Sequence, residues 1–84
     1  MQQFMRKFQQ LNGKSAKIIL EHCLFDKQVF NCDILQIIDD DEKIGLIIKQ
    51  QNIFMYKSNV KVTEAYADAY IMSDGRLTIK IFLK

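Results

Sequence analysis

Residues 43–64, KIGLIIKQQNIFMYKSNVKVTE, decide the fold, because they hold three short apolar runs separated by polar breaks. In the first run Ile44, Leu46 and Ile48 fall on one face of an extended chain, which is the period of a β-strand. The runs IFMY and VKVT that follow are rich in the residue types that strands favour. The segment therefore predicts strand, turn, strand, tight break and strand, which is the second half of a small β-barrel.

The same residues carry a family resemblance. LIIK followed by IFMYKSNVKV resembles the second conserved segment of Sm-like proteins, in particular the bacterial Hfq branch. In that branch an apolar run ending in Leu-Lys is followed by a Tyr-Lys-His turn and a short last strand. Tyr56 and Lys57 match the start of that turn, whereas Ser58 stands where the family has histidine and Ile44 stands where it carries a base-stacking aromatic. The resemblance covers residues 2–64.

The resemblance implies a small, strongly bent, five-stranded antiparallel β-barrel that assembles into a homo-oligomer and binds single-stranded RNA. In this reading Tyr56 stacks on a base, and Lys57, Lys49 and Lys61 contact backbone phosphates. The alternative is a protein-protein interaction or regulatory module built on the same small barrel, in which the added helix and hairpin supply the partner surface.

Length and composition limit the class of protein. A chain of 84 residues, 49% of them hydrophobic, predicts one domain with one core. The uninterrupted apolar runs are far shorter than the roughly 20 residues of a membrane helix. No apolar signal core follows Arg6 and Lys7. We therefore expect a cytoplasmic protein without a membrane partner. The net charge of +2 leaves RNA binding open without indicating it.

The N-terminal segment predicts a helix over residues 2–12. Phe4, Phe8 and Leu11 lie on one stripe at helical spacing, and Gly13 stands where a helix end favours a left-handed residue. A helix this short is barely stable alone in water, so its stripe must dock on the rest of the protein. We expect it to cap one end of the barrel over residues 14–64. A partner-binding or membrane-surface helix is the alternative.

Residues 14–25 and 29–39 predict two further strands. We expect a turn centred between Lys27 and Gln28. A slip of one residue in this register would exchange the two faces of the hairpin.

That register places four metal-ligating side chains in one hairpin. Cys23 faces Cys32, and His22 faces Asp33 on the other face. Adjacent strand residues point to opposite faces, so these side chains do not converge on one ion. We expect no metal or cofactor, two buried reduced thiols and a polar pair at the rim, with a cross-strand disulfide as the alternative to free thiols.

Two turns complete the chain. Residues 39–42, DDDE, predict a solvated turn, because a calcium loop alternates its ligands and has glycine at the bend. Residues 65–84 predict a hairpin appended to the barrel, with Asp74 and Gly75 as its turn. This hairpin extends the sheet of the barrel or pairs with a neighbouring subunit. If the turn is centred between these two residues, Met72 faces Leu77.

The inventory of reactive side chains predicts no enzyme. His22 is the only histidine, no serine or cysteine is flanked by a recognisable base and acid, and the three glycines form no phosphate-binding loop. The sequence therefore predicts a binding protein.

Overall fold

The computed structural model describes residues 2–84, which form one short helix and eight strands in two antiparallel sheets. Helix α1 (Gln2–Phe8) continues into a 3-10 turn, η1 (Gln9–Leu11). The strands are β1 (Ser15–His22), β2 (Phe25–Asp33), β3 (Gln36–Asp39), β4 (Lys43–Ile47), β5 (Asn52–Tyr56), β6 (Val62–Ala65), β7 (Ala69–Ser73) and β8 (Leu77–Leu83), with a second 3-10 turn, η2 (Lys57–Asn59), between β5 and β6.

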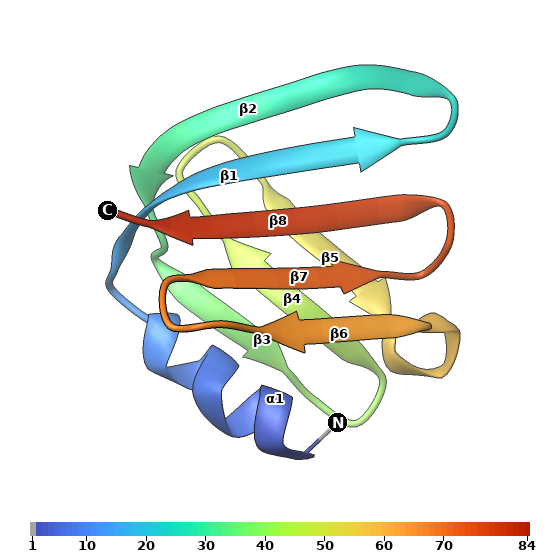
Figure 1. The fold of residues 1–84 in the computed structure, drawn as a ribbon, viewed down its shortest axis with the longest axis horizontal. Coiled ribbons are helices and arrows are strands. Elements are labelled where there is room, and N and C mark those ends of the chain that lie inside the picture. Colours follow the sequence, from blue (N-terminus) through green and yellow to red (C-terminus); the bar gives the residue numbers. More distant parts are fainter. Residues whose placement is uncertain (1) are drawn as a thin grey trace.

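The strands form two layers. A five-stranded sheet in the order β2-β1-β8-β7-β6 lies in front of a three-stranded sheet in the order β3-β4-β5, whose strands cross it obliquely (Figure 1). This confirms the mainly β, antiparallel class with a short N-terminal helix. Within residues 2–84 no strand pairing joins the two sheets, so they do not close into the expected barrel.

The core lies between the two sheets and is formed by the apolar residues that alternate along the strands. Ile44, Leu46 and Ile48 are all buried, which confirms the face assigned to them. Burying an isoleucine or leucine side chain stabilises the fold by about 1.5–3 kcal/mol. The five-stranded sheet contributes the inward residues Ala16, Ile18, Leu20, Tyr70, Met72, Ile79 and Ile81.

Helix α1 and η1 cover the end of the core beside β6 and β3 (Figure 1). Phe4, Phe8 and Leu11 are buried, as their spacing predicts. The Phe4 ring meets the Tyr70 ring edge-on, with centroids 6.3 Å apart. Gly13, two residues after η1 ends, has a φ of +81°, a left-handed conformation that glycine adopts without strain as the chain turns into β1.

The turn predicted at Lys27 and Gln28 is wrong. The chain reverses at Cys23 and Leu24, and His22 pairs with Phe25. The Leu24 backbone N–H donates to Nδ1 of His22 over 3.0 Å, so the histidine side chain closes the turn locally. The facing pairs expected for the cysteines and for His22 therefore do not form.

The expected strand over residues 29–39 is two strands. β2 ends at Asp33, and after Ile34 and Leu35 the chain enters β3 in the other sheet. Ile34 is buried, and its backbone N–H donates to the carbonyl of Lys14 over 2.8 Å. The segment that the sequence predicts as one strand is therefore divided between the two sheets.

The C-terminal hairpin turns within the predicted Asp74-Gly75 region, but Ser73 faces Thr78, so the turn is centred between Gly75 and Arg76, one residue later than expected. Met72 faces Ile79 and not Leu77, so the register is shifted by two residues from the expected one. A shift of two leaves every side chain on its expected face. Gly75, with a φ of +93°, supplies the turn.

This hairpin is part of the larger sheet. β8 pairs with β1 along residues 77–83, and β7 pairs with β6. The C-terminal strand therefore offers no free edge. The open edges are β2 and β6 in the larger sheet and β3 and β5 in the smaller one.

The acidic segment is the expected exposed turn. Oδ1 of Asp40 accepts hydrogen bonds from the backbone N–H groups of Glu42, over 2.8 Å, and Lys43, over 2.7 Å. Asp39, by contrast, ends β3. In residues 2–84 no helix has the length and apolarity needed to cross a membrane.

Candidate nucleic-acid interface

The outer face of the three-stranded sheet carries two exposed aromatic side chains. Along β5 Ile53 and Met55 point into the core, while Phe54 and Tyr56 are 39% and 47% exposed on the other face. Their rings meet edge-on at 87°, with centroids 6.0 Å apart. Nζ of Lys43 lies 5.0 Å from the centroid of the Phe54 ring, within the range of a cation–π interaction. We call Lys43, Phe54 and Tyr56 the aromatic patch.

A glycine lies beside the patch on the neighbouring strand. Gly45 pairs with Phe54 across β4 and β5, and no side chain rises between them. β5 is also an edge strand, so the patch borders open space on one side. An extended ligand can therefore lie along β5 without meeting another strand.

A cleft lies beyond the end of β5. It has a volume of about 560 Å³ and lies between the segment after Tyr56 and the turn of the β7–β8 hairpin. Two cationic side chains, Lys61 and Arg76, line it together with the carboxylate of Asp74. We call it the basic cleft, and its lining is Ser58, Asn59, Val60, Lys61, Asp74, Gly75 and Arg76.

Asp74 serves the hairpin turn from inside this cleft. Its Oδ1 accepts hydrogen bonds from the backbone N–H groups of Arg76, over 2.9 Å, and Leu77, over 2.7 Å. Burial acts to raise the pKa of this carboxyl, but these backbone hydrogen bonds outweigh it and hold the pKa below its usual value. Asp74 is therefore an anion held by the turn, and the two cations remain to meet a ligand.

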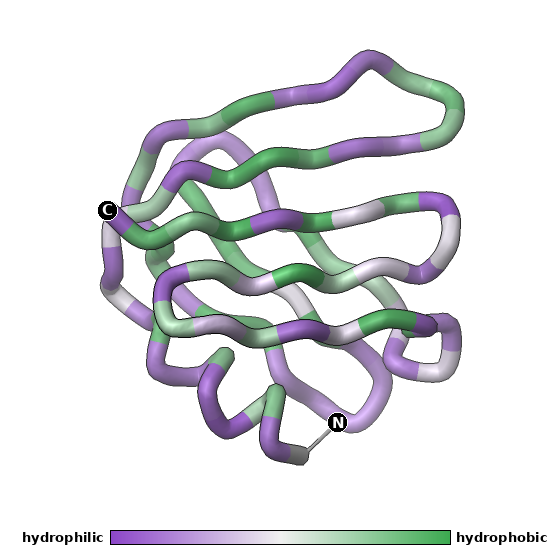
Figure 2. Tube along the Cα trace, in the orientation of Figure 1, coloured by the Kyte–Doolittle hydropathy of each residue, from purple (hydrophilic) through white to green (hydrophobic). Residues whose placement is uncertain are grey.

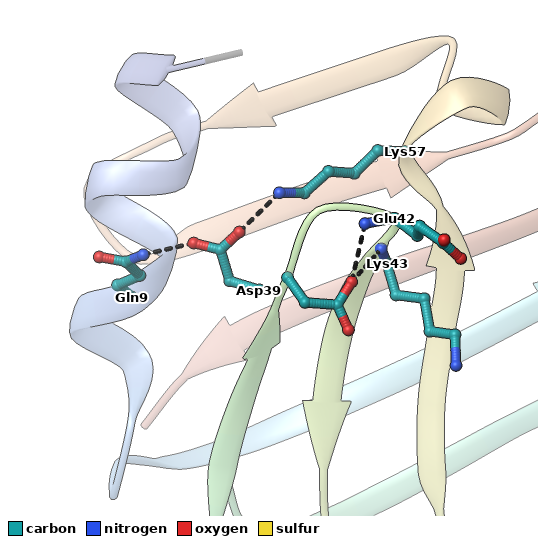
Figure 3. Close-up of polar contacts among 6 residues, drawn as sticks. Gln9, Asp39, Glu42, Lys43 and Lys57 are labelled. Atoms are coloured by element: carbon teal, nitrogen blue, oxygen red, sulfur yellow. Dashed lines mark hydrogen bonds and ion pairs between the residues drawn. The ribbon is translucent and has the colours of Figure 1, made fainter.

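Lys57, one of the residues expected to contact phosphate, points away from the patch. Its Nζ lies 2.7 Å from Oδ1 of Asp39, and Gln9 donates to the same carboxylate (Figure 3). The Lys57 hydrogen bond holds the pKa of Asp39 below its usual value. Lys57 thus ties η2 to β3 and to the helical segment.

The other three expected residues lie at separate places. Tyr56 is in the aromatic patch at the end of β5, and Lys61 is in the basic cleft. Lys49 is exposed in the turn between β4 and β5, before the opposite end of β5. A five-residue strand spans about 13 Å, so Lys49 and Tyr56 are not neighbours.

Sequence reasoning missed Phe54, Lys43 and Arg76. The signal for Phe54 is the alternation in IFMY, which places both aromatics on the face opposite the two aliphatic residues. Lys43 follows from the pairing of β4 with β5. No local sequence pattern identifies Arg76. The order of strands in the larger sheet brings the β7–β8 turn to the cleft, and that order cannot be read from nearby residues.

The hairpin of β1 and β2 holds no metal site. Both cysteines are free thiols, and Cys23 is exposed, which corrects the expectation that both are buried. Cys32 is half-buried, and burial raises its pKa. The His22 ring lies against the Phe25 ring, with centroids 5.0 Å apart. Across residues 2–84 no group of three or more His, Cys, Asp or Glu side chains is placed to hold a metal ion.

No protein-family model matches the chain, and neither a curated protein nor a solved structure does.

Proposed function

We propose that the protein binds single-stranded RNA on the aromatic patch and has no catalytic role. The observation that carries the proposal is the pair of exposed aromatic rings, Phe54 and Tyr56, side by side on an edge strand with Lys43 beside them. Every base has a π-face, so exposed rings stack on bases with little sequence preference. Lys43, whose Nζ lies over the Phe54 ring, is close enough to meet the phosphate of a base that stacks beside it on Tyr56.

The basic cleft extends this surface along the chain of the ligand. η2 connects Tyr56, at the end of β5, to the segment that carries Lys61. A strand of RNA that leaves the patch at Tyr56 passes Lys61 and Arg76, whose charges suit the next phosphates. Lys57 is not assigned a phosphate, since Asp39 holds it. Lys49 is placed to meet only a ligand that runs the full length of β5.

The likeness to Sm-like proteins leads us to propose further that the two sheets correspond to an opened small barrel and that the protein works as a homo-oligomer. Support comes from the short helix before β1, the antiparallel run β3-β4-β5 and the 3-10 turn between β5 and β6. β5 and β6 both have an unpaired edge, which leaves them open to strands of neighbouring subunits.

A protein-interaction module is the second candidate, and one observation favours it. Leu24 and Phe25 at the tip of the β1–β2 hairpin are 78% and 72% exposed. The tip is therefore hydrophobic, whereas hydrophobic and polar residues alternate along the rest of the hairpin (Figure 2). Exposed apolar side chains in a cluster mark contact surfaces more often than isolated ones do.

Fluorescence anisotropy with labelled uridine-rich and adenine-rich oligonucleotides tests the RNA proposal. Tyr56→Ala and Phe54→Leu remove or reduce a stacking ring, and loss of a stacked base costs about 1–3 kcal/mol. We therefore expect each change to weaken binding by roughly 5- to 150-fold. Tyr66→Ala is the matched control, because Tyr66 is an exposed tyrosine on the β6–β7 connection that contacts Glu64.

Two results would contradict the proposal. The first is the absence of binding to either oligonucleotide at low salt. The second is an equal loss of affinity in Tyr56→Ala and Tyr66→Ala, which would mean that any exposed tyrosine serves as well. Melting temperatures of all three variants show whether each retains the fold.

A further inference from the structure

In residues 2–84, β2 is the longest strand and pairs with a single neighbour. Its nine residues pair with β1 on one side and leave the other side open. Most of its side chains are exposed, and no proline interrupts it. An edge strand of this length presents a row of unpaired backbone groups, which is a template for another strand.

The hydrogen bonds of the neighbouring strand show which backbone groups of β2 face outward. Cys23 N–H donates to the Arg76 carbonyl over 3.1 Å, and Lys84 N–H donates to the Ser15 carbonyl over 3.3 Å. The odd-numbered residues of β1 therefore bond to β8. Because bonding direction alternates along a strand, the even-numbered residues of β1 bond to β2.

The partners of those even-numbered residues are Gln28, Phe30 and Cys32, so their N–H and C=O groups are already used. The bonds between Ile34 and the segment before β1 continue the same series. The odd-numbered residues of β2 consequently direct their N–H and C=O groups to the open edge. These residues are Lys27, Val29, Asn31 and Asp33.

A second copy of β2 is complementary to this edge. In an antiparallel pair centred on Phe30, Lys27 lies opposite the partner's Asp33, and by symmetry the same pair forms twice. Within residues 2–84 neither side chain takes part in an ion pair, although Ser15 donates a hydrogen bond to Asp33. Opposite charges that face each other across strands stabilise the pair, and like charges destabilise it.

Other registers lose this match. A pair centred on Val29 places Phe25 opposite the partner's Asp33, and one centred on Lys27 places two lysines together. In the register centred on Phe30, the two Phe30 side chains face each other at a non-hydrogen-bonded position, where side chains come closest. Phe30 is half-buried on the inner face, so its partner covers its remaining exposed surface.

We propose that two copies of this chain pair antiparallel through β2, centred on Phe30, and join their five-stranded sheets into one. The interface is isologous, because each β2 meets the same strand of its partner, so this contact joins two copies and leaves the edges of β5 and β6 free for other subunits. The aromatic patch lies on the other sheet, which contributes no strand to this interface.

A disulfide reports the register directly. Gln28 faces the partner's Cys32 at a non-hydrogen-bonded position, where Cα atoms lie about 4.5 Å apart, inside the range for a disulfide. In a Cys23→Ser background, Gln28→Cys should give a disulfide-linked dimer when oxidised glutathione takes up the electrons of the two thiols. Asp26→Cys is the control, because residue 26 faces the partner's Cys32 only in a pair centred on Val29.

Charge reversal tests the same register without a new bond. Lys27→Glu and Asp33→Lys each place like charges opposite one another, and we expect each to weaken self-association by roughly tenfold. The double variant restores opposite charges and should restore the dimer. Light scattering separates the dimer from the 9.9 kDa monomer.

Three outcomes would overturn the proposal. One is a monomer mass for the unmodified chain at hundreds of micromolar. Another is cross-linking of Asp26→Cys that equals or exceeds that of Gln28→Cys. The third is a double charge variant that associates no better than the single ones.

Discussion

Gly45 faces Phe54 across β4 and β5 so closely that a Cβ atom on Gly45 would lie 2.7 Å from the Cβ of Phe54 and 2.0 Å from the carbonyl oxygen of Ile53. The carbonyl oxygen belongs to the backbone, so it cannot move aside as the end of a flexible side chain can. The two strands therefore keep their spacing at this point only with glycine.

Gly45→Ala should destabilise the protein by about 3 kcal/mol, since the added methyl forces β4 and β5 apart. Gly13→Ala is the comparison. A Cβ atom at position 13 would meet no neighbour, so Gly13→Ala should destabilise the protein only through the positive φ, by about 1–2 kcal/mol. Chemical denaturation of both variants checks the order. A smaller loss in Gly45→Ala than in Gly13→Ala would show that the strands can adjust.

Phe8→Ala should cost about 3–5 kcal/mol, because the fully buried ring leaves a cavity under the helix. It stacks on Phe4 at a centroid distance of 5.4 Å, so the loss also loosens the first turn of α1. The exposed neighbour Lys7 provides the control, and Lys7→Ala should change the free energy of unfolding by less than about 0.5 kcal/mol. Equal effects of the two changes in urea denaturation would mean that the helix does not cap the core.

Asp39→Asn should lower stability at neutral pH and have no effect in acid. Lys57 holds the pKa of Asp39 below its usual 3.8, so the charged form is favoured in the folded protein. The stabilisation is present above the pKa of the unfolded chain and is lost as the pH falls through the folded value. For this partly exposed pair we expect roughly 0.2–1 kcal/mol.

Asp41→Asn removes the same charge from the exposed turn and serves as the control for Asp39→Asn. Unfolding free energies measured from neutral pH down to about pH 3 separate the two variants. If the gap between Asp39→Asn and the unmodified protein stays constant across this range, the Lys57 contact is not its source.

Lys61→Gln and Arg76→Gln should each reduce the salt dependence of oligonucleotide binding by about one unit of slope, because each removes one phosphate contact. Lys14→Gln has the same change in net charge. It serves as the control because Lys14 lies far from the basic cleft. Lys14 directly precedes β1, and Arg76 of the cleft bonds through its carbonyl to Cys23, just after the opposite end of β1. A slope that falls equally in all three variants would mean that net charge alone, and not the basic cleft, sets the affinity.

Local pattern predicts the elements of this fold well. The alternation of Ile44, Leu46 and Ile48 identifies a strand and its buried face, and Gly75 identifies a turn. Both signals act within a few residues. The helix follows from the spacing of Phe4 and Phe8 for the same reason.

The positions of the strands in the sheet are not local. The β1–β2 turn falls at Cys23 and Leu24, two residues with no preference for turns, because pairing with β8 and the bond to His22 fix its place. The same holds for the candidate site. The resemblance to Sm-like proteins points to Tyr56, whereas Arg76 reaches the cleft through contacts between distant segments.

The order of strands also sets how the protein reaches its fold. β1 and β2 are made first, yet β1 pairs on its other side with β8, so that Ile18 lies opposite Ile81. Contacts between residues so far apart in the sequence slow folding, because closing the loop between them costs conformational entropy before the contact can form. We therefore expect the β1–β2 hairpin to leave one side of β1 unpaired until β8 pairs with it, so that completion of the five-stranded sheet is a late step in folding.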